Sequence, residues 1–80
     1  MPEAIVLLST EVGAEEEVFK ELLRIRNVIE AYIVYGVYDM VAKIRAGSHD
    51  ELREVIVNRI RRIPKVRSTT TMVVVESSIK

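Results

Sequence analysis

The stretch Tyr35-Gly36-Val37-Tyr38-Asp39 lies between two extended apolar runs, residues 29–34 and 40–46. This arrangement predicts a β-hairpin whose tip is the quoted stretch. Gly36 suits a sharp turn because glycine, which lacks a Cβ atom, tolerates a positive φ. Two tyrosines and an aspartate exceed what a turn requires, so the tip is also a candidate ligand site.

The hairpin divides the chain into two similar halves, each with a strand, a helix and a strand. The expected strands cover residues 4–9, 28–35, 39–46 and 66–76, which are rich in apolar and β-branched side chains. A first helix is expected over residues 14–26, with Asn27 as a left-handed cap. A second begins at the capping pair Ser48 and Glu51 and stops before Pro64.

Two such units joined by a tight hairpin predict one α+β domain over residues 1–80, a ferredoxin-like βαββαβ sandwich. Its four-stranded antiparallel sheet has the first and third strands in the centre. Two helices, each about 10 Å across, cover only one face of strands spaced about 4.8 Å apart. The second face is therefore expected to stay open.

The open face predicts self-association. The first and last strands contain runs, residues 4–8 and 72–75, that are apolar at every position, so half of each run points to this face. Its area is on the order of 400 Å², a size at which an apolar patch usually has a partner. Tyr32, Val34 and Val41 are expected to face that partner, with Lys43 and Arg45 toward the rim.

Composition excludes several classes of function. The chain has no cysteine and one histidine, His49, which argues against thiol catalysis, disulfides and a metal or other cofactor site. Twelve basic and twelve acidic residues give no net charge, so direct nucleic-acid binding is not expected. No apolar run is long enough to cross a membrane and no basic leader is present, which predicts a cytoplasmic protein.

Several polar groups could bind a ligand, and each has a plainer explanation. Asp39 could receive an ammonium group, or it could cap the turn. Tyr35 and Tyr38 could wall a pocket, although tyrosine is common at hairpin ends. The hydroxyls of residues 68–71 could bind a small zwitterion, or the threonines could simply favour a strand.

Other charged groups point to no catalytic site. Glu15, Glu16 and Glu17 fit the first turn of a helix, where acids offset the helix dipole. His49 has no second fixed group beside it in the sequence for acid–base chemistry. A basic cluster near residues 59–67 could touch phosphates, but helix-end placement explains much of it. The chain is therefore not expected to be an enzyme.

Residues 28–75 resemble the effector (RAM) domain of Lrp/AsnC transcriptional regulators. The likeness lies in Gly-x-x-Asp at the hairpin and Thr-x-Thr before an apolar last strand, in the expected order of elements. The resemblance implies a domain that dimerises through its sheet and assembles into rings, commonly octamers. It also implies amino-acid binding between dimers.

Matching positions assign Gly36 and Asp39 to the first element and Thr69 and Thr71 to the second. Val37, Tyr38 and Thr70 are their variable neighbours, and these seven residues form the expected ligand site. The hairpin and the last strand are expected to come together through neighbouring subunits or adjacent strand ends.

The chain opens directly on its first strand, whereas full-length relatives begin with a helix-turn-helix domain. It therefore resembles the stand-alone form, which would sense an amino acid or co-assemble with full-length regulators. Two alternatives remain: a small dimeric α/β-barrel enzyme, because fold does not determine function, and a purely structural assembly domain.

Overall fold

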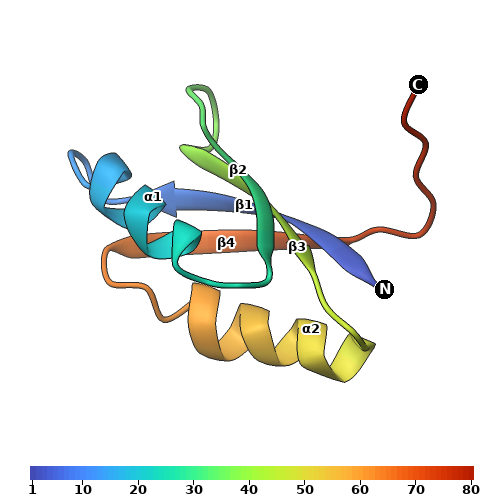
Figure 1. Ribbon diagram of the computed structural model, residues 1–80. Helices are drawn as coiled ribbons and strands as arrows, with labels where there is room; N and C mark the ends of the chain where they lie inside the picture. The colour runs from blue at the N-terminus through green and yellow to red at the C-terminus, as the bar shows by residue number, and fades with distance from the viewer.

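The structure, a computed structural model, describes all residues from 1 to 80. Four strands and two helices follow the predicted order, and a π-helical segment, η1, continues the second helix (Figure 1). The elements are β1 Glu3–Thr10, α1 Glu15–Leu23, β2 Val28–Ile33, β3 Met40–Arg45, α2 His49–Val55, η1 Ile56–Ile60 and β4 Val66–Val73. Neither helix has the length and apolar character that crossing a membrane demands.

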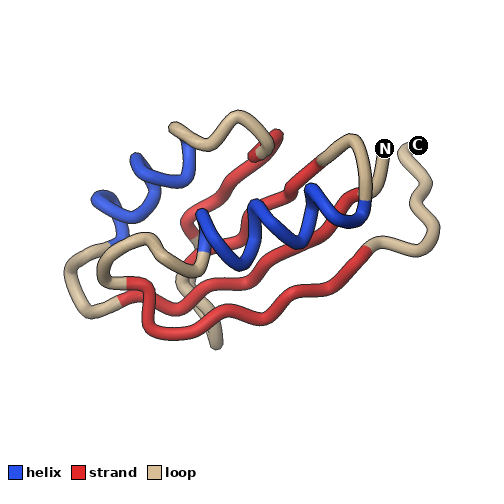
Figure 2. The backbone as a smooth tube through the Cα atoms, turned by 90° about the horizontal axis from the view of Figure 1, so that it is seen from below, coloured by secondary structure: helices blue, strands red, loops and turns tan.

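The strands form one antiparallel sheet in the order β2-β3-β1-β4, so β1 and β3 are central as predicted. Val6 of β1, for example, pairs with Ala42 of β3 on one side and Thr71 of β4 on the other. Both helices pack against the same face (Figure 2). The fold is the predicted ferredoxin-like α+β sandwich.

The core follows from strict alternation along the two central strands. In β1 every second side chain is buried, and β3 repeats the pattern. These side chains meet the apolar stripes of both helices in one cluster of sixteen residues. Its members are Ala4, Val6, Leu8, Ala14, Val18, Leu22, Ile25, Met40, Ala42, Ile44, Ala46, Leu52, Val55, Ile56, Ile60 and Ile63.

The opposite face of the sheet is uncovered, as expected. Tyr32, which pairs with Val41, is 52% exposed and Met72, which pairs with Ile5, is 46% exposed. Ile5, Leu7 and Val41 are only partly buried. The register therefore confirms that Tyr32 and Val41 share this face. We call Ile5, Leu7, Tyr32, Val41 and Met72 the open-face patch.

Element ends differ from the prediction where tertiary contacts decide them. The first helix ends at Leu23 rather than at residue 26. Strand β4 ends at Val73 rather than at residue 76; the N–H of Val74 still donates to the carbonyl of Glu3 at 2.9 Å, and β1 begins at that residue. Asn27 is not a left-handed cap, since the only non-glycine residue with positive φ is Lys65.

The second helix widens near its end. The backbone N–H of Arg61 donates to the carbonyl of Ile56 at 3.0 Å, five residues back instead of four. The wide turn keeps Ile56 and Ile60 in the core while Val57 stays at the surface. Such π turns are often found at functional sites, and this one borders the cleft described below.

Candidate functional site

The hairpin tip extends beyond the end of the sheet and is largely exposed (Figure 1). Gly36 has φ of +149°, which confirms the predicted need for glycine, and open space surrounds the position of a Cβ atom. The backbone N–H of Val34 donates to the carbonyl of Asp39 at 2.9 Å and closes the loop. The side chains of Tyr35 and Val37 project into solvent.

Asp39 is tied to the neighbouring strand. Its Oδ2 atom accepts a hydrogen bond of 2.8 Å from the backbone N–H of Thr10, and its own N–H donates to the carbonyl of Leu8 at 2.9 Å. Thr10 follows a register shift between β1 and β4, pairs with Val66 and is 4% exposed. One carboxylate oxygen therefore satisfies a backbone donor, while the other has no hydrogen-bond partner in this chain.

Tyr38 connects the hairpin to β4 across the open face. Its hydroxyl lies 3.0 Å from Oγ1 of Thr70, and either oxygen can be the donor. Thr70 pairs with Leu7 of the intervening strand, so the tyrosine spans β1 to reach it. The hairpin and the threonine segment therefore meet within one chain, at this one pair of residues.

Thr69 and Thr71 point to the other side of the sheet. Their partners Leu8 and Val6 are core residues, so both threonines face the helices. They line a cleft of about 480 Å³ between β4 and the second helix, a size typical of ligand pockets. We call this the β4–α2 cleft; its lining residues are His49, Leu52, Arg53, Ile56, Val57, Arg61, Thr69, Thr71 and Val73.

The seven predicted site residues thus occupy three places in one chain. Thr69 and Thr71 line the cleft, Tyr38 and Thr70 meet on the open face, and Gly36, Val37 and Asp39 lie in the hairpin outside the cleft. The period of two along β4 separates Thr70 from its neighbours. Within one chain the two elements meet only through Tyr38 and Thr70, and neither Gly36 nor Asp39 lines the cleft that holds Thr69 and Thr71.

Two arginines line the cleft: Arg61, which the sequence placed in a basic cluster near the helix end, and Arg53, to which it gave no role. Arg53 and Arg61 come from α2 and the end of η1, and Val57 lies between them at four-residue steps. That spacing, which places side chains on one helix face, was the available signal. Neither arginine forms an ion pair within the chain.

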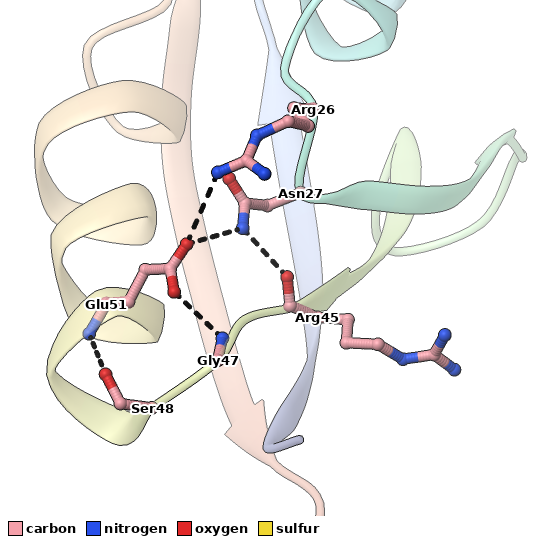
Figure 3. A network of polar contacts seen from close by, with 6 residues as sticks. All are labelled: Arg26, Asn27, Arg45, Gly47, Ser48 and Glu51. Carbon is pink, nitrogen blue, oxygen red and sulfur yellow. Dashed lines mark hydrogen bonds and ion pairs between the residues drawn. The ribbon is translucent and has the colours of Figure 1, made fainter.

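A polar network around Glu51 holds the start of α2 (Figure 3). Oε1 of Glu51 accepts from the N–H of Gly47 at 2.8 Å, and Oε2 accepts from Nδ2 of Asn27 at 3.2 Å. The N–H of Glu51 donates to Oγ of Ser48 at 3.1 Å, so half of the predicted capping box forms. Because Gly47 and then Asn27 stabilise the charged form, the pKa of Glu51 lies below its ordinary value.

A second charged cluster lies at the edge of the open face. Glu3, whose side chain is 15% exposed, contacts Arg45 at 2.6 Å and Lys43 at 3.7 Å. The hydrogen bond from Arg45 lowers the pKa of Glu3 below its ordinary value, and the nearby Lys43 charge lowers it further. The predicted rim residues are therefore paired within the chain.

Nothing in the structure assembles a metal site, since no group of three or more His, Asp or Glu side chains is placed to hold an ion. The β4–α2 cleft contains one histidine and no carboxylate. His49 is an exposed residue of the lining, and no carboxylate lines the cleft to orient its ring. The cleft thus offers binding groups, with no acid–base pair among them.

Comparison with known proteins places these features in a family. The model of the Lrp/AsnC ligand binding domain matches residues 3–80. The HTH-type transcriptional regulator FL11 of Pyrococcus abyssi is 35% identical over 74 residues, which are 92% of this chain and 48% of FL11. The chain therefore spans about half the length of that relative.

Solved structures agree with the fold. The crystal structure of FFRP-DM1 matches with a TM-score of 0.90 at 37% identity, over 94% of this chain and 100% of that chain. The transcriptional regulator NMB0573 of Neisseria meningitidis, solved as an L-Met complex, matches with a TM-score of 0.85 over 99% of this chain and 53% of that chain. At 11% identity, the second match shows the shared fold alone.

Proposed function

The chain belongs to the Lrp/AsnC ligand-binding domain family, and we propose that it binds a small amino-acid-like ligand between dimers and thereby changes its own assembly. One observation carries this proposal. Thr69 and Thr71 line an open cleft, while Gly36 and Asp39 of the same chain lie outside it. A site that combines Thr69 and Thr71 with Gly36 and Asp39 needs a second copy of the chain.

The open-face patch supports the dimer. Five apolar side chains lie together on a face that no helix covers, and Tyr32 and Met72 are about half exposed. Burying apolar surface contributes about 25 cal/mol per Å², so covering the patch in a dimer is favourable. Residues 1–80 act as one domain in this proposal, in keeping with their single core cluster.

The mechanism is thermodynamic linkage. A ligand that contacts Thr69 and Thr71 of one subunit and the hairpin of another binds only when the two are in contact. Such a ligand stabilises that assembly according to its concentration relative to its dissociation constant. The effect is reciprocal, so assembly raises ligand affinity by the same factor.

A role in transcription would pass through full-length relatives. FL11 is a transcriptional regulator, and this chain matches about half of it. A ligand-binding domain that pairs through the same surface as these regulators would exchange into their assemblies. This role places the chain in the cytoplasm. It needs no DNA contact by the chain itself and no catalysis.

Calorimetric titration with each of the twenty amino acids tests ligand binding, and light scattering with and without ligand tests assembly. We expect at least one amino acid to bind and to shift the molar mass. An L-Met complex of a protein with this fold makes methionine one of the first probes. Binding without any change in mass would favour an independent pocket, and no binding at all would leave a purely structural assembly domain.

A further inference from the structure

A second concave site lies between the C-terminal ends of the two helices. We call it the interhelix groove; its volume is about 450 Å³, and its lining residues are Glu21, Arg24, Ile25, Arg59, Arg62, Ile63 and Pro64. None of these residues lines the β4–α2 cleft. Three guanidinium groups and one carboxylate therefore share a groove that the proposed amino-acid site does not use.

The core fixes the backbone on both walls of the interhelix groove. Arg24, Arg59 and Arg62 each directly precede an isoleucine of the core cluster. The isoleucines are buried, whereas the arginines are exposed. Arg24 follows the end of α1, and Arg59 and Arg62 come from the end of η1 and the turn after it. Three guanidinium groups thus reach the groove from two separate elements whose positions are set by packing.

The interhelix groove has an excess of positive charge. Glu21 pairs with Arg24 at 3.1 Å, but Arg59 and Arg62 form no ion pair within the chain. The C-terminal end of each helix carries a partial negative charge of about half a unit. The two ends together offset about one of the two free guanidinium charges, so the groove remains complementary to an anion.

We infer that the interhelix groove binds the polyphosphate group of a small molecule, such as a nucleoside triphosphate. A guanidinium presents paired N–H donors that match the oxygens of a phosphate. Arg24 donates from one wall and Arg59 and Arg62 from the other, so adjacent phosphoryl groups contact both walls. The volume of the groove lies within the range of about 300–1,000 Å³ that is usual for small-molecule sites.

Two other kinds of anion fit the groove less well. A single carboxylate engages one guanidinium through its two oxygens and leaves the second free arginine without a partner. A nucleic acid needs an extended basic surface, whereas this chain has no net charge and Glu21 lies in the groove itself. A short, highly charged group matches the groove better than either of these.

Calorimetry at fixed ionic strength with sodium triphosphate, orthophosphate, acetate and a short DNA duplex tests the inference. We expect triphosphate to bind at least about tenfold more tightly than orthophosphate, because it places charged oxygens against both walls. ATP, which carries the same group, should compete with triphosphate. The affinity for triphosphate should fall as the KCl concentration rises, because salt screens exposed charges.

Paired variants locate the contact. Arg59→Ala combined with Arg62→Ala should weaken triphosphate binding at least about tenfold, because two charge-assisted hydrogen-bond donors are lost. Arg67→Ala combined with Lys80→Ala is the matched control; it removes the same charge from exposed positions outside the groove and should change the affinity less than about twofold.

A third variant separates charge from geometry. Arg59→Lys combined with Arg62→Lys keeps both charges but loses the paired donors, and it should weaken triphosphate binding about threefold. Circular dichroism verifies that each variant folds. The lysine variant provides the test by itself if the alanine variant does not fold, and an unchanged affinity in it would overturn the role of the guanidinium groups.

The remaining outcomes are equally decisive. A loss confined to the Arg59 and Arg62 variants, with triphosphate preferred, supports the polyphosphate site. Equal losses in the control pair, absence of triphosphate binding, or binding of orthophosphate or acetate as tight as that of triphosphate would overturn it. DNA that bound as tightly as triphosphate, through the same two arginines, would assign the groove to nucleic acid instead. None of these results bears on amino-acid binding in the β4–α2 cleft, so the two proposals can fail separately.

Discussion

Replacing Asp39 with alanine should destabilise the fold itself, before any ligand is considered. The carboxylate accepts a 2.8 Å hydrogen bond from the backbone N–H of Thr10, a residue that is 4% exposed. Alanine leaves this donor without a partner in a place that water reaches poorly. Losing a charge-assisted hydrogen bond and stranding its donor costs about 2 kcal/mol. For a domain of this size, that cost lowers the melting temperature by about 8–16 °C.

Urea unfolding followed by far-ultraviolet circular dichroism measures this cost, at one protein concentration because assembly also contributes to stability. Asp39→Asn is the matched variant, since its amide oxygen can still accept from Thr10, and it should lose about half as much. Tyr38→Phe, which removes only an exposed hydroxyl contact, should change the free energy of unfolding by less than about 0.5 kcal/mol. A loss below about 0.5 kcal/mol in Asp39→Ala would refute the structural role. If the role holds, Asp39→Asn is the better variant for testing ammonium recognition.

Three further predictions concern charge, assembly and packing. The fold lowers the pKa of Glu51, so the ionised carboxylate stabilises the folded state fully above its ordinary pKa of 4.5, and this stabilisation is lost as pH falls through the pKa of the folded state. The urea midpoint of Glu51→Gln should therefore fall less between pH 5 and pH 3 than that of the parent. Val41→Lys, in the open-face patch, should reduce the molar mass measured by light scattering, whereas a lysine at the exposed turn residue Val12 should not. Leu22→Ala leaves a cavity at a fully buried site and should lower the free energy of unfolding in urea by about 2–5 kcal/mol. Leu23→Ala, at a neighbouring side chain that is 58% exposed, should lower it by less than about 1 kcal/mol. Equal losses in the two variants would contradict the assigned helix face.

The fold was predictable because local signals and the global pattern agree. Apolar alternation in β1 and β3, the glycine turn at Gly36 and the Ser48 cap each indicate one element, and only a few topologies join those elements. The element ends were not predictable, because they depend on neighbours. Val74 and Val75 have the β-branched character of a strand, yet β1 begins at Glu3, which bonds the N–H of Val74 and is the last partner that β1 offers.

The cleft could not be predicted from the same signals. Arg53 and Arg61 are typical of a solvated helix surface, and only the packing of the second helix beside β4 places them near Thr69 and Thr71. Asp39 illustrates the converse. The sequence left two roles open for Asp39, turn capping or ligand binding. In the structure the side chain has a third role, because one carboxylate oxygen accepts a hydrogen bond from the backbone N–H of Thr10 on the next strand.

Strand β4 contributes to two surfaces of the domain, the cleft and the open face, through Thr69, Thr70 and Thr71. Side chains alternate along β4, so two threonines face the cleft while the one between them faces the open side with Met72. Thr70 in turn contacts Tyr38 of the hairpin at 3.0 Å. Strand β4 is an edge strand that pairs only with β1. A ligand that moved the backbone of β4 would therefore move the side chains on the cleft side and on the open side together. The same displacement would reach the open-face patch and the hairpin, which are the two surfaces that the proposed assembly requires.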